Sequence, residues 1–77
     1  ASSSRKGGSV MVDARGQSCP IPVVMTRKAL EKEKPARLEV LVDAQVAVEN
    51  VTRCARSLGY QVTAEPQGTD FKLILSK

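Results

Sequence analysis

Cys19 is the residue of this sequence that points most directly to chemistry. It lies in the segment RGQSCPIP, where Pro20 follows it directly and Pro22 comes two residues later. The 77 residues include two cysteines and no histidine, which excludes the usual zinc sites because these need about four Cys or His ligands. The chemistry that these residue types allow is therefore that of a thiol, without a metal or an organic cofactor.

The two prolines are explained if a helix begins immediately after Cys19. Proline is favoured in the first turn of a helix because an N–H group there has no partner within the helix. Cys19 would then be the N-cap residue, where the helix dipole and free N–H groups lower the pKa of a thiol and favour the nucleophilic thiolate. The prolines lack N–H groups, so Ile21 and Val23 are the main amides on offer. We predict a moderately activated thiol that can accept an atom and release it again.

Cys54 has a simpler interpretation. On the second helix expected below, it shares an apolar arc with Val51 and Ala55, which predicts that it packs in the core. Pro22 stands where the second cysteine of a C-x-x-C redox motif would be, and a Cys19–Cys54 disulfide is not expected in a reducing compartment. From the residues alone, the interpretation of Cys19 as an inert buried thiol also stays open.

The N-terminal half is expected to place Cys19 between a strand and a helix. The run SVMVDA at 9–14 is typical of a strand that ends near Asp13. Gly16 can supply a positive φ in the tight loop that follows. Good helix formers then extend from Pro20 to about Glu33.

The remainder of the chain predicts one more helix and three more strands. Asp43 is a candidate N-cap for this helix, and Gly59 is its expected C′ residue. Alternating apolar residues in the last two strands, with turn residues between them, predict a hairpin. The expected elements are an inner strand at 37–43, a helix between 43 and 59, a strand at 60–65, a turn at 66–70 and a strand at 71–76.

This order of elements, βαβαββ, predicts an α+β fold. Two helices can cover only one face of a four-stranded sheet, so we expect a two-layer α/β sandwich with a mixed sheet and both helices on one face. The second helix supports this arrangement because its apolar residues fall on one arc. Those residues are Ala47, Val48, Val51, Cys54, Ala55 and Leu58.

The first helix carries two apolar arcs near its N-terminus. One arc is assigned to the sheet and consists of Pro22, Val23, Thr26, Ala29 and Leu30. The other consists of Ile21, Val24, Met25 and Lys28, and it adjoins Arg27. Because the second arc contains charge, we assign it to solvent and predict an exposed apolar patch beside Cys19 that docks a protein partner. The reverse assignment, with Ile21, Val24 and Met25 in the core, is the alternative.

Composition and charge exclude several classes of function. The formal net charge is +4, but without Arg5 and Lys6 the chain holds 10 basic and 8 acidic residues, and it has one tyrosine and one phenylalanine. This is too weak a charge and too few stacking side chains for a nucleic-acid partner. No apolar run is long enough to enter a membrane or act as a signal peptide. We expect a cytoplasmic protein in which residues 1–9 are a disordered leader or an expression remnant and residues 10–77 form one domain.

The segment DARGQSCPIP resembles the signature D-x-x-G-x-x-C-P-x-P of the TusA/SirA/YedF family of small sulfur carriers. The matching residues are Asp13, Gly16, Cys19, Pro20 and Pro22. The resemblance implies a fold like that of the C-terminal domain of translation initiation factor three. It also implies that Cys19 takes persulfide sulfur from a cysteine desulfurase and relays it to an acceptor protein, as a sulfurtransferase-type carrier. Asp13, Gly16, Pro20 and Pro22 would then support the loop and the helix start.

The resemblance suggests partners and a branch of the family. Partner-binding roles fall on residues near the carrier thiol, namely Arg15, Ile21, Val24, Met25, Arg27 and Lys28. The segment from Asp43 to Tyr60 is similar to the YedF-like branch associated with selenium metabolism, in which a DsrE-like domain often follows and would be one type of acceptor. The alternative function is a regulatory or protein-docking adaptor that does not use its thiol.

Overall fold

The first strand and the first helix flank the segment that contains Cys19. The computed structural model describes residues 9–16 and 21–77. The predictions made for Cys19 and Pro20, and for a leader before Ser9, lie outside the described residues. The elements are β1 (Ser9–Asp13), α1 (Ile21–Lys32), β2 (Arg37–Val42), α2 (Gln45–Ser57), β3 (Gln61–Gln67) and β4 (Asp70–Ser76).

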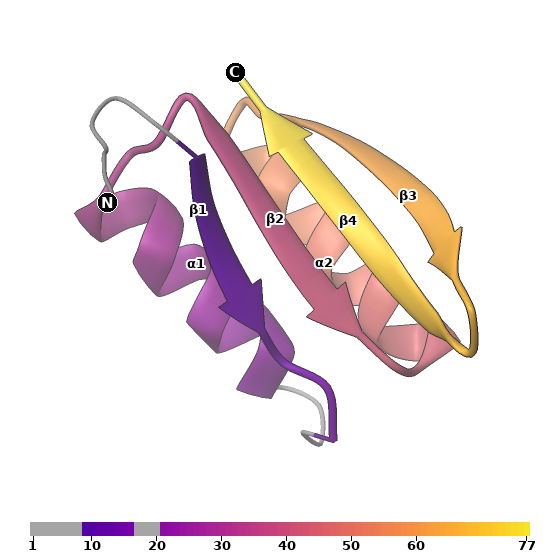
Figure 1. The fold of residues 1–77 in the computed structure, drawn as a ribbon. Coiled ribbons are helices and arrows are strands. Elements are labelled where there is room, and N and C mark those ends of the chain that lie inside the picture. Colours follow the sequence, from indigo (N-terminus) through magenta and orange to yellow (C-terminus); the bar gives the residue numbers. More distant parts are fainter. Residues whose placement is uncertain (1–8, 17–20) are drawn as a thin grey trace, which may run out of the picture.

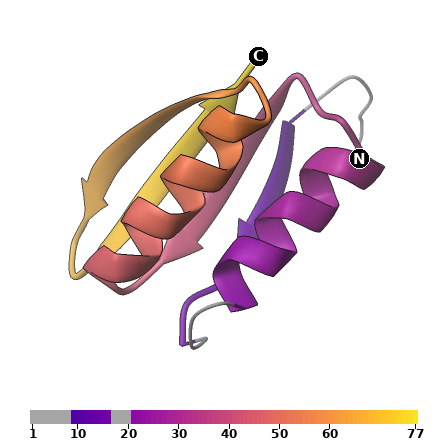
Figure 2. The same cartoon turned by 180° about the vertical axis from the view of Figure 1, so that it is seen from behind.

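The four strands form one mixed sheet in the order β1-β2-β4-β3. β1 is parallel to β2, whereas β2 and β3 are each antiparallel to β4. Figures 1 and 2 show that both helices lie on the same face of this sheet. The predicted α+β sandwich and its βαβαββ order are therefore confirmed.

Alternate residues of the central strands form the core beneath the helices. In β2, Leu38, Val40 and Val42 are buried, while the two residues between them are half-buried. This alternation arises because the helices cover only one face of the sheet. The other fully buried side chains of the described residues include Val51 of α2 and Leu73 and Leu75 of β4.

The ends of α2 differ in how well the sequence predicts them. Gly59 has φ +92° and its N–H donates to Arg56 O (3.0 Å), while the N–H of Tyr60 donates to Ala55 O (3.0 Å). These two bonds form a Schellman motif, which confirms the predicted C-terminus. The predicted N-cap is wrong: Ala44 occupies that position, without a side-chain cap. Asp43 instead bonds to a distant loop, as described below.

The β3–β4 hairpin has longer strands and a shorter turn than predicted. Residues 66–70 were expected to form the turn, but Pro66 pairs with Phe71 and Gln67 pairs with Asp70. The turn therefore consists of Gly68 and Thr69. Pro66 is tolerated because β3 is at the edge of the sheet, where a strand does not need every N–H group.

Candidate functional site

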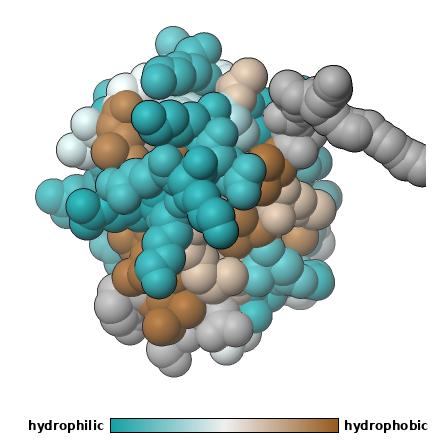
Figure 3. All heavy atoms as spheres, turned by 90° about the vertical axis from the view of Figure 1, so that its left-hand side faces the viewer, coloured by the Kyte–Doolittle hydropathy of each residue, from teal (hydrophilic) through white to brown (hydrophobic). Residues whose placement is uncertain are grey.

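The first turn of α1 presents apolar side chains beside the segment 17–20. Ile21 is 43% exposed and Val24 is 41% exposed, whereas Pro22 is buried. Figure 3 shows hydrophobic side chains on this side of the molecule reaching the end where α1 begins. The assignment of Ile21 and Val24 to the solvent-facing arc is therefore confirmed. Their role in partner binding stays a prediction.

Met25 departs from the predicted patch. It is half-buried and packs against the core cluster, because it lies between the exposed arc and the arc that faces the sheet. The sheet-facing arc itself is as predicted: Thr26 and Leu30 are buried, and Val23 and Ala29 are half-buried. The exposed patch is thus narrower than the sequence indicates.

The loop between β1 and α1 is organised by Arg15 and Asp13. The Arg15 backbone N–H donates to Asp13 Oδ1 (3.2 Å). The Arg15 side chain donates to the same carboxylate through Nε to Oδ1 (3.1 Å) and Nη2 to Oδ2 (3.2 Å). These hydrogen bonds lower the pKa of Asp13 below its ordinary value, and they raise the pKa of Arg15.

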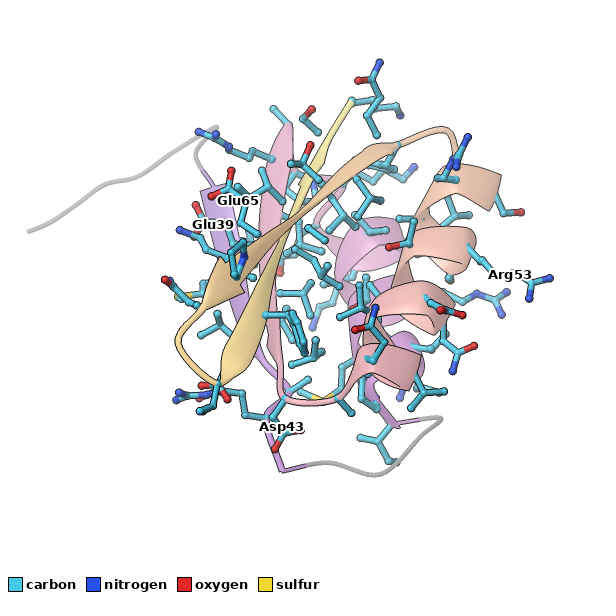
Figure 4. The ribbon with its side chains drawn as sticks, turned by 90° about the vertical axis from the view of Figure 1, so that its right-hand side faces the viewer. Glu39, Asp43, Arg53 and Glu65 are labelled. Atoms are coloured by element: carbon cyan, nitrogen blue, oxygen red, sulfur yellow. The ribbon has the colours of Figure 1, made fainter. Side chains whose placement is uncertain are left out.

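Three further contacts fix the same loop to other parts of the molecule. The N–H of Ala14, a buried residue, donates to Leu41 O (2.8 Å). Arg15 Nη1 donates to Asp70 Oδ2 (3.2 Å) at the start of β4. The N–H of Gly16 donates to Asp43 Oδ2 (3.0 Å), and Figure 4 shows Asp43 on the connection between β2 and α2. Residues 14–16 are therefore attached to β2, to β4 and to the β2–α2 connection.

Gly16 has the backbone conformation expected of it. Its φ is +78°, in the left-handed region where a side chain is disfavoured. This conformation lets the chain turn after β1 while the Gly16 N–H faces the Asp43 carboxylate. The loop geometry explains why Asp13 and Gly16 both occur in the sequence pattern around Cys19.

The basic residues near the site differ in their partners. Arg15 is bound by two carboxylates, and Arg27 pairs with Glu31 one turn along α1 (Nε to Oε2, 3.0 Å), which raises the pKa of Arg27. Lys28 is exposed. The positive charges of Arg15 and Arg27 are therefore balanced locally by acidic residues.

Cys54 is only half-buried, so its predicted place within the core is wrong. The thiol is free and lies with Arg27, Ser57 and Leu58 around a shallow hollow of about 300 Å³ between α1 and α2. Leu58 is 38% exposed, because α2 ends before that residue. The side of α2 that packs against the sheet is narrower than the predicted arc and contains Ala47, Val48, Val51 and Ala55.

The structure gathers most of the predicted site at one end of the molecule. Asp13, Arg15 and Gly16 form the loop, and Ile21 and Val24 stand at the start of α1. Arg27 and Lys28 lie further along the helix, about two turns from its first residue.

Sequence reasoning missed Asp43 and Asp70 as parts of this site. Both are acidic residues at the ends of strands, but they contact the loop across 27 and 55 positions of the sequence. Only the strand order, which brings the ends of β1, β2 and β4 together, reveals these contacts. The position of Asp43 after an apolar strand was the one available signal.

No helix among residues 9–16 and 21–77 is both long and apolar enough to span a membrane.

Fold and loop together define a class of small two-layer α+β domains, with a short anchored loop between the first strand and the first helix. A crystal structure of a SirA-like protein from Desulfitobacterium hafniense has this fold, with a TM-score of 0.79 and 33% identity over 87% of this chain and 95% of that one. The family model described as sulfurtransferase TusA matches residues 10–77. The chain belongs to the TusA/SirA family.

Two further relatives carry descriptions that refer to sulfur. A candidate sulfur carrier protein of Methanocaldococcus jannaschii is 40% identical over 68 residues, which cover 86% of this chain and 91% of the relative. A candidate sulfur carrier protein of Thermotoga maritima is 38% identical over 52 residues, which cover 66% of each chain. The family match over residues 10–77 includes the segment between β1 and α1 and both helices.

Proposed function

We propose that this chain is a persulfide carrier in which Cys19 holds the transferred sulfur. Membership of a sulfur-carrier family, through a match that spans residues 10–77, is the observation that carries the proposal. The match includes the D-x-x-G-x-x-C-P-x-P residues that surround this cysteine. The candidate sulfur carrier relatives support the same function.

The proposed transfer is a thiol exchange that needs no external oxidant. The Cys19 thiolate attacks the terminal sulfur of a donor persulfide, R–S–SH, and a new S–S bond forms on Cys19. The S–S bond of the donor breaks, and the donor leaves as a thiolate. Cys19 then carries S–SH, which an acceptor thiolate attacks in the same way. The terminal sulfur keeps its oxidation state in both steps.

The described residues support this chemistry through the ends of the loop. Cys19 is three residues after Gly16 and two before Ile21, so the covalent chain limits its Cα to within about 7 Å of Ile21 Cα. A partner that approaches the thiol therefore meets the exposed side chains of Ile21 and Val24. Asp13 and Gly16 shape the loop, and the prolines at 20 and 22 suit the beginning of α1.

The donor in this proposal is a cysteine desulfurase, and the acceptor is another protein of a sulfur relay, of DsrE-like or similar type. Both would act in the cytoplasm, where thiols stay reduced. The carrier itself would need no cofactor, because its partners supply the persulfide and the proton transfers. A role in the YedF-like branch of selenium metabolism is the more specific form of this proposal.

The test is the transfer of sulfur to the intact protein. Wild type is incubated with a cysteine desulfurase and cysteine, and its mass is measured without reducing agent. Wild type and Cys54→Ser should gain one sulfur, whereas Cys19→Ser should gain none. Because Cys54 is a free, partly accessible thiol, Cys54→Ser is the matched control.

Two results would contradict the proposal. A Cys19→Ser protein that still gains sulfur would remove the assignment of the carrier residue. A wild-type protein that gains none would favour the adaptor function, in which the exposed side chains of α1 dock a partner and the thiol is not used.

A further inference from the structure

Asp43 lies directly before the N-cap position of α2, and its side chain does not cap the helix. It is one residue before Ala44, the N-cap of α2, whose backbone is extended (φ −138°, ψ 139°) and which has no side-chain cap. An aspartate at the N-cap position itself stabilises a helix, because its side-chain oxygen accepts from a free N–H group of the first turn. In this chain the acidic residue is displaced by one position, and its carboxylate points to another loop.

The hydrogen-bond donor to Asp43 belongs to the loop that leads to Cys19. The carboxylate Oδ2 accepts a hydrogen bond of 3.0 Å from the N–H of Gly16, 27 residues earlier. An ionised acceptor makes a stronger hydrogen bond than a neutral one. Asp43 is exposed and outside the hydrophobic core, so packing does not account for its orientation.

The hydrogen bond from Gly16 to Asp43 adds to the contacts that hold residues 15 and 16 in place. The guanidinium of Arg15 is held from two sides by Asp13 and Asp70, and the N–H of Gly16 is held by Asp43. On the other side of Cys19, Pro22 is buried at the start of α1. The segment that carries the thiol is thus bounded by two fixed points only six positions apart.

We propose that Asp43 is a positioning residue for sulfur transfer, acting through Gly16 on the approach of the Cys19 thiol to a partner persulfide. This inference rests on the proposed carrier function. The in-line attack of one sulfur on another requires a defined geometry, and a displacement of about 1 Å can slow such a step by up to about 100-fold. Holding Gly16 fixes the point from which the chain enters the segment that contains Cys19.

The test compares a substitution that keeps an acceptor oxygen with one that removes it. Asp43→Asn keeps a side-chain oxygen that can accept from Gly16, whereas Asp43→Ala removes it. Asp43→Ala should lower the rate of sulfur loading from a cysteine desulfurase by about 10-fold, within the range for a misplaced reacting group. Asp43→Asn should restore the rate to within about 2-fold of wild type. Glu49→Ala, which removes an exposed carboxylate from α2, is the charge-matched control and should load like wild type.

A second measurement reads the contact without any sulfur chemistry. The Gly16 amide should exchange its hydrogen with solvent several-fold faster in Asp43→Ala than in wild type, and Asp43→Asn should restore its protection. Circular dichroism and thermal unfolding establish that each variant is folded. Should Asp43→Ala not fold, Asp43→Leu keeps the bulk of the side chain without the acceptor and serves in its place.

The outcomes separate this inference from the function on which it rests. If wild type loads sulfur and Asp43→Ala loads equally fast, the positioning role is wrong while the carrier function stands. An unchanged exchange rate at Gly16 would also overturn the role, because the hydrogen bond would then make no difference in solution. If wild type does not load sulfur on Cys19, the carrier function falls first and the positioning role falls with it.

Discussion

Arg15 is the residue whose contacts connect the most distant parts of the site. Its guanidinium bonds to Asp13 in the same loop and to Asp70 at the start of β4. The side chain is about half exposed, and exposed ion pairs contribute little to stability. Its main effect is therefore on geometry, because a planar group with fixed donors orients both carboxylates.

The Arg15 contacts predict a specific titration of Asp13. In Arg15→Ala the pKa of Asp13 should rise part of the way to the ordinary aspartate value, because the side-chain hydrogen bonds from Arg15 are the largest cause of its lowered pKa and the backbone N–H bond remains. An acid whose pKa is lowered by folding stabilises the folded state above its ordinary pKa, about 3.9, and this contribution is lost as the pH falls through the lowered value. The loop should thus keep this contact throughout the neutral range.

The measurement is a pH titration of the side-chain carboxyl carbon of Asp13 by NMR. Wild type should have a lower midpoint than Arg15→Ala. Arg37→Ala, which removes a cation from the first residue of β2, is the control and should leave the midpoint close to that of wild type. Equal midpoints in wild type and Arg15→Ala would show that the guanidinium does not bind Asp13 in solution.

At the scale of the elements, α1 contains a polar group on the face that packs against the sheet. Thr26 is fully buried, and its hydroxyl has no hydrogen-bond partner among the residues that the structure describes. A buried hydroxyl without a partner loses its bonds to water and gains none in return. The methyl group of the same side chain needs no such partner, so the cost belongs to the hydroxyl oxygen.

Replacing this oxygen should stabilise the protein. Thr26→Val has nearly the same shape and no hydroxyl, so it should raise the free energy of unfolding by about 1 kcal/mol. Thr26→Ala is the control, because it also removes the methyl group and leaves a small cavity. It should be less stable than Thr26→Val in a urea titration. If Thr26→Val is less stable than wild type, the hydroxyl has a partner in solution.

Local rules predicted the elements well because each element is determined by its own residues. The helix that contains Pro22, the end of α2 at Gly59 and the presence of the β3–β4 hairpin all follow from backbone preferences within a few positions. Asp43 shows where such rules stop. Its type and position satisfy the local pattern of a cap, but a long-range acceptor role at Gly16 competes and prevails.

Side chains at the boundary of a helix face were harder to predict for a similar reason. Met25 and Cys54 lie at the margins of their helices' buried faces and are half-buried. Periodicity indicates the direction in which a side chain points from its helix axis. It does not indicate how far the neighbouring helix covers that side chain. Their exposure therefore depends on how α1 and α2 pack against each other, which no single segment encodes.

For the whole molecule, the topology separates two kinds of surface. The uncovered face of the sheet carries Met11, which is 60% exposed, and an ion pair of Lys72 with Glu39 (3.4 Å). Figure 4 shows Glu39 and Glu65 on this face, while Arg53 projects from α2 on the opposite side.

The loops after β1 and β2 and the β3–β4 turn share one end of the sheet. Under the proposed function, a partner would approach this end, where α1 begins.

This geometry allows a matched test of docking with two exposed valines. Val24 lies in the first turns of α1 and is 41% exposed, and Val46 lies in the first turn of α2 and is 57% exposed. If the partner covers the start of α1, Val24→Ser removes apolar area from the interface. The expected loss is about 1 kcal/mol, equivalent to an increase of about fivefold in the KM of a cysteine desulfurase for the carrier. Val46→Ser makes the same chemical change at the same end of the molecule but on α2, and it should raise the KM less than Val24→Ser does, although Val46 is the more exposed residue. Equal effects of the two substitutions would mean that the partner does not dock beside the thiol.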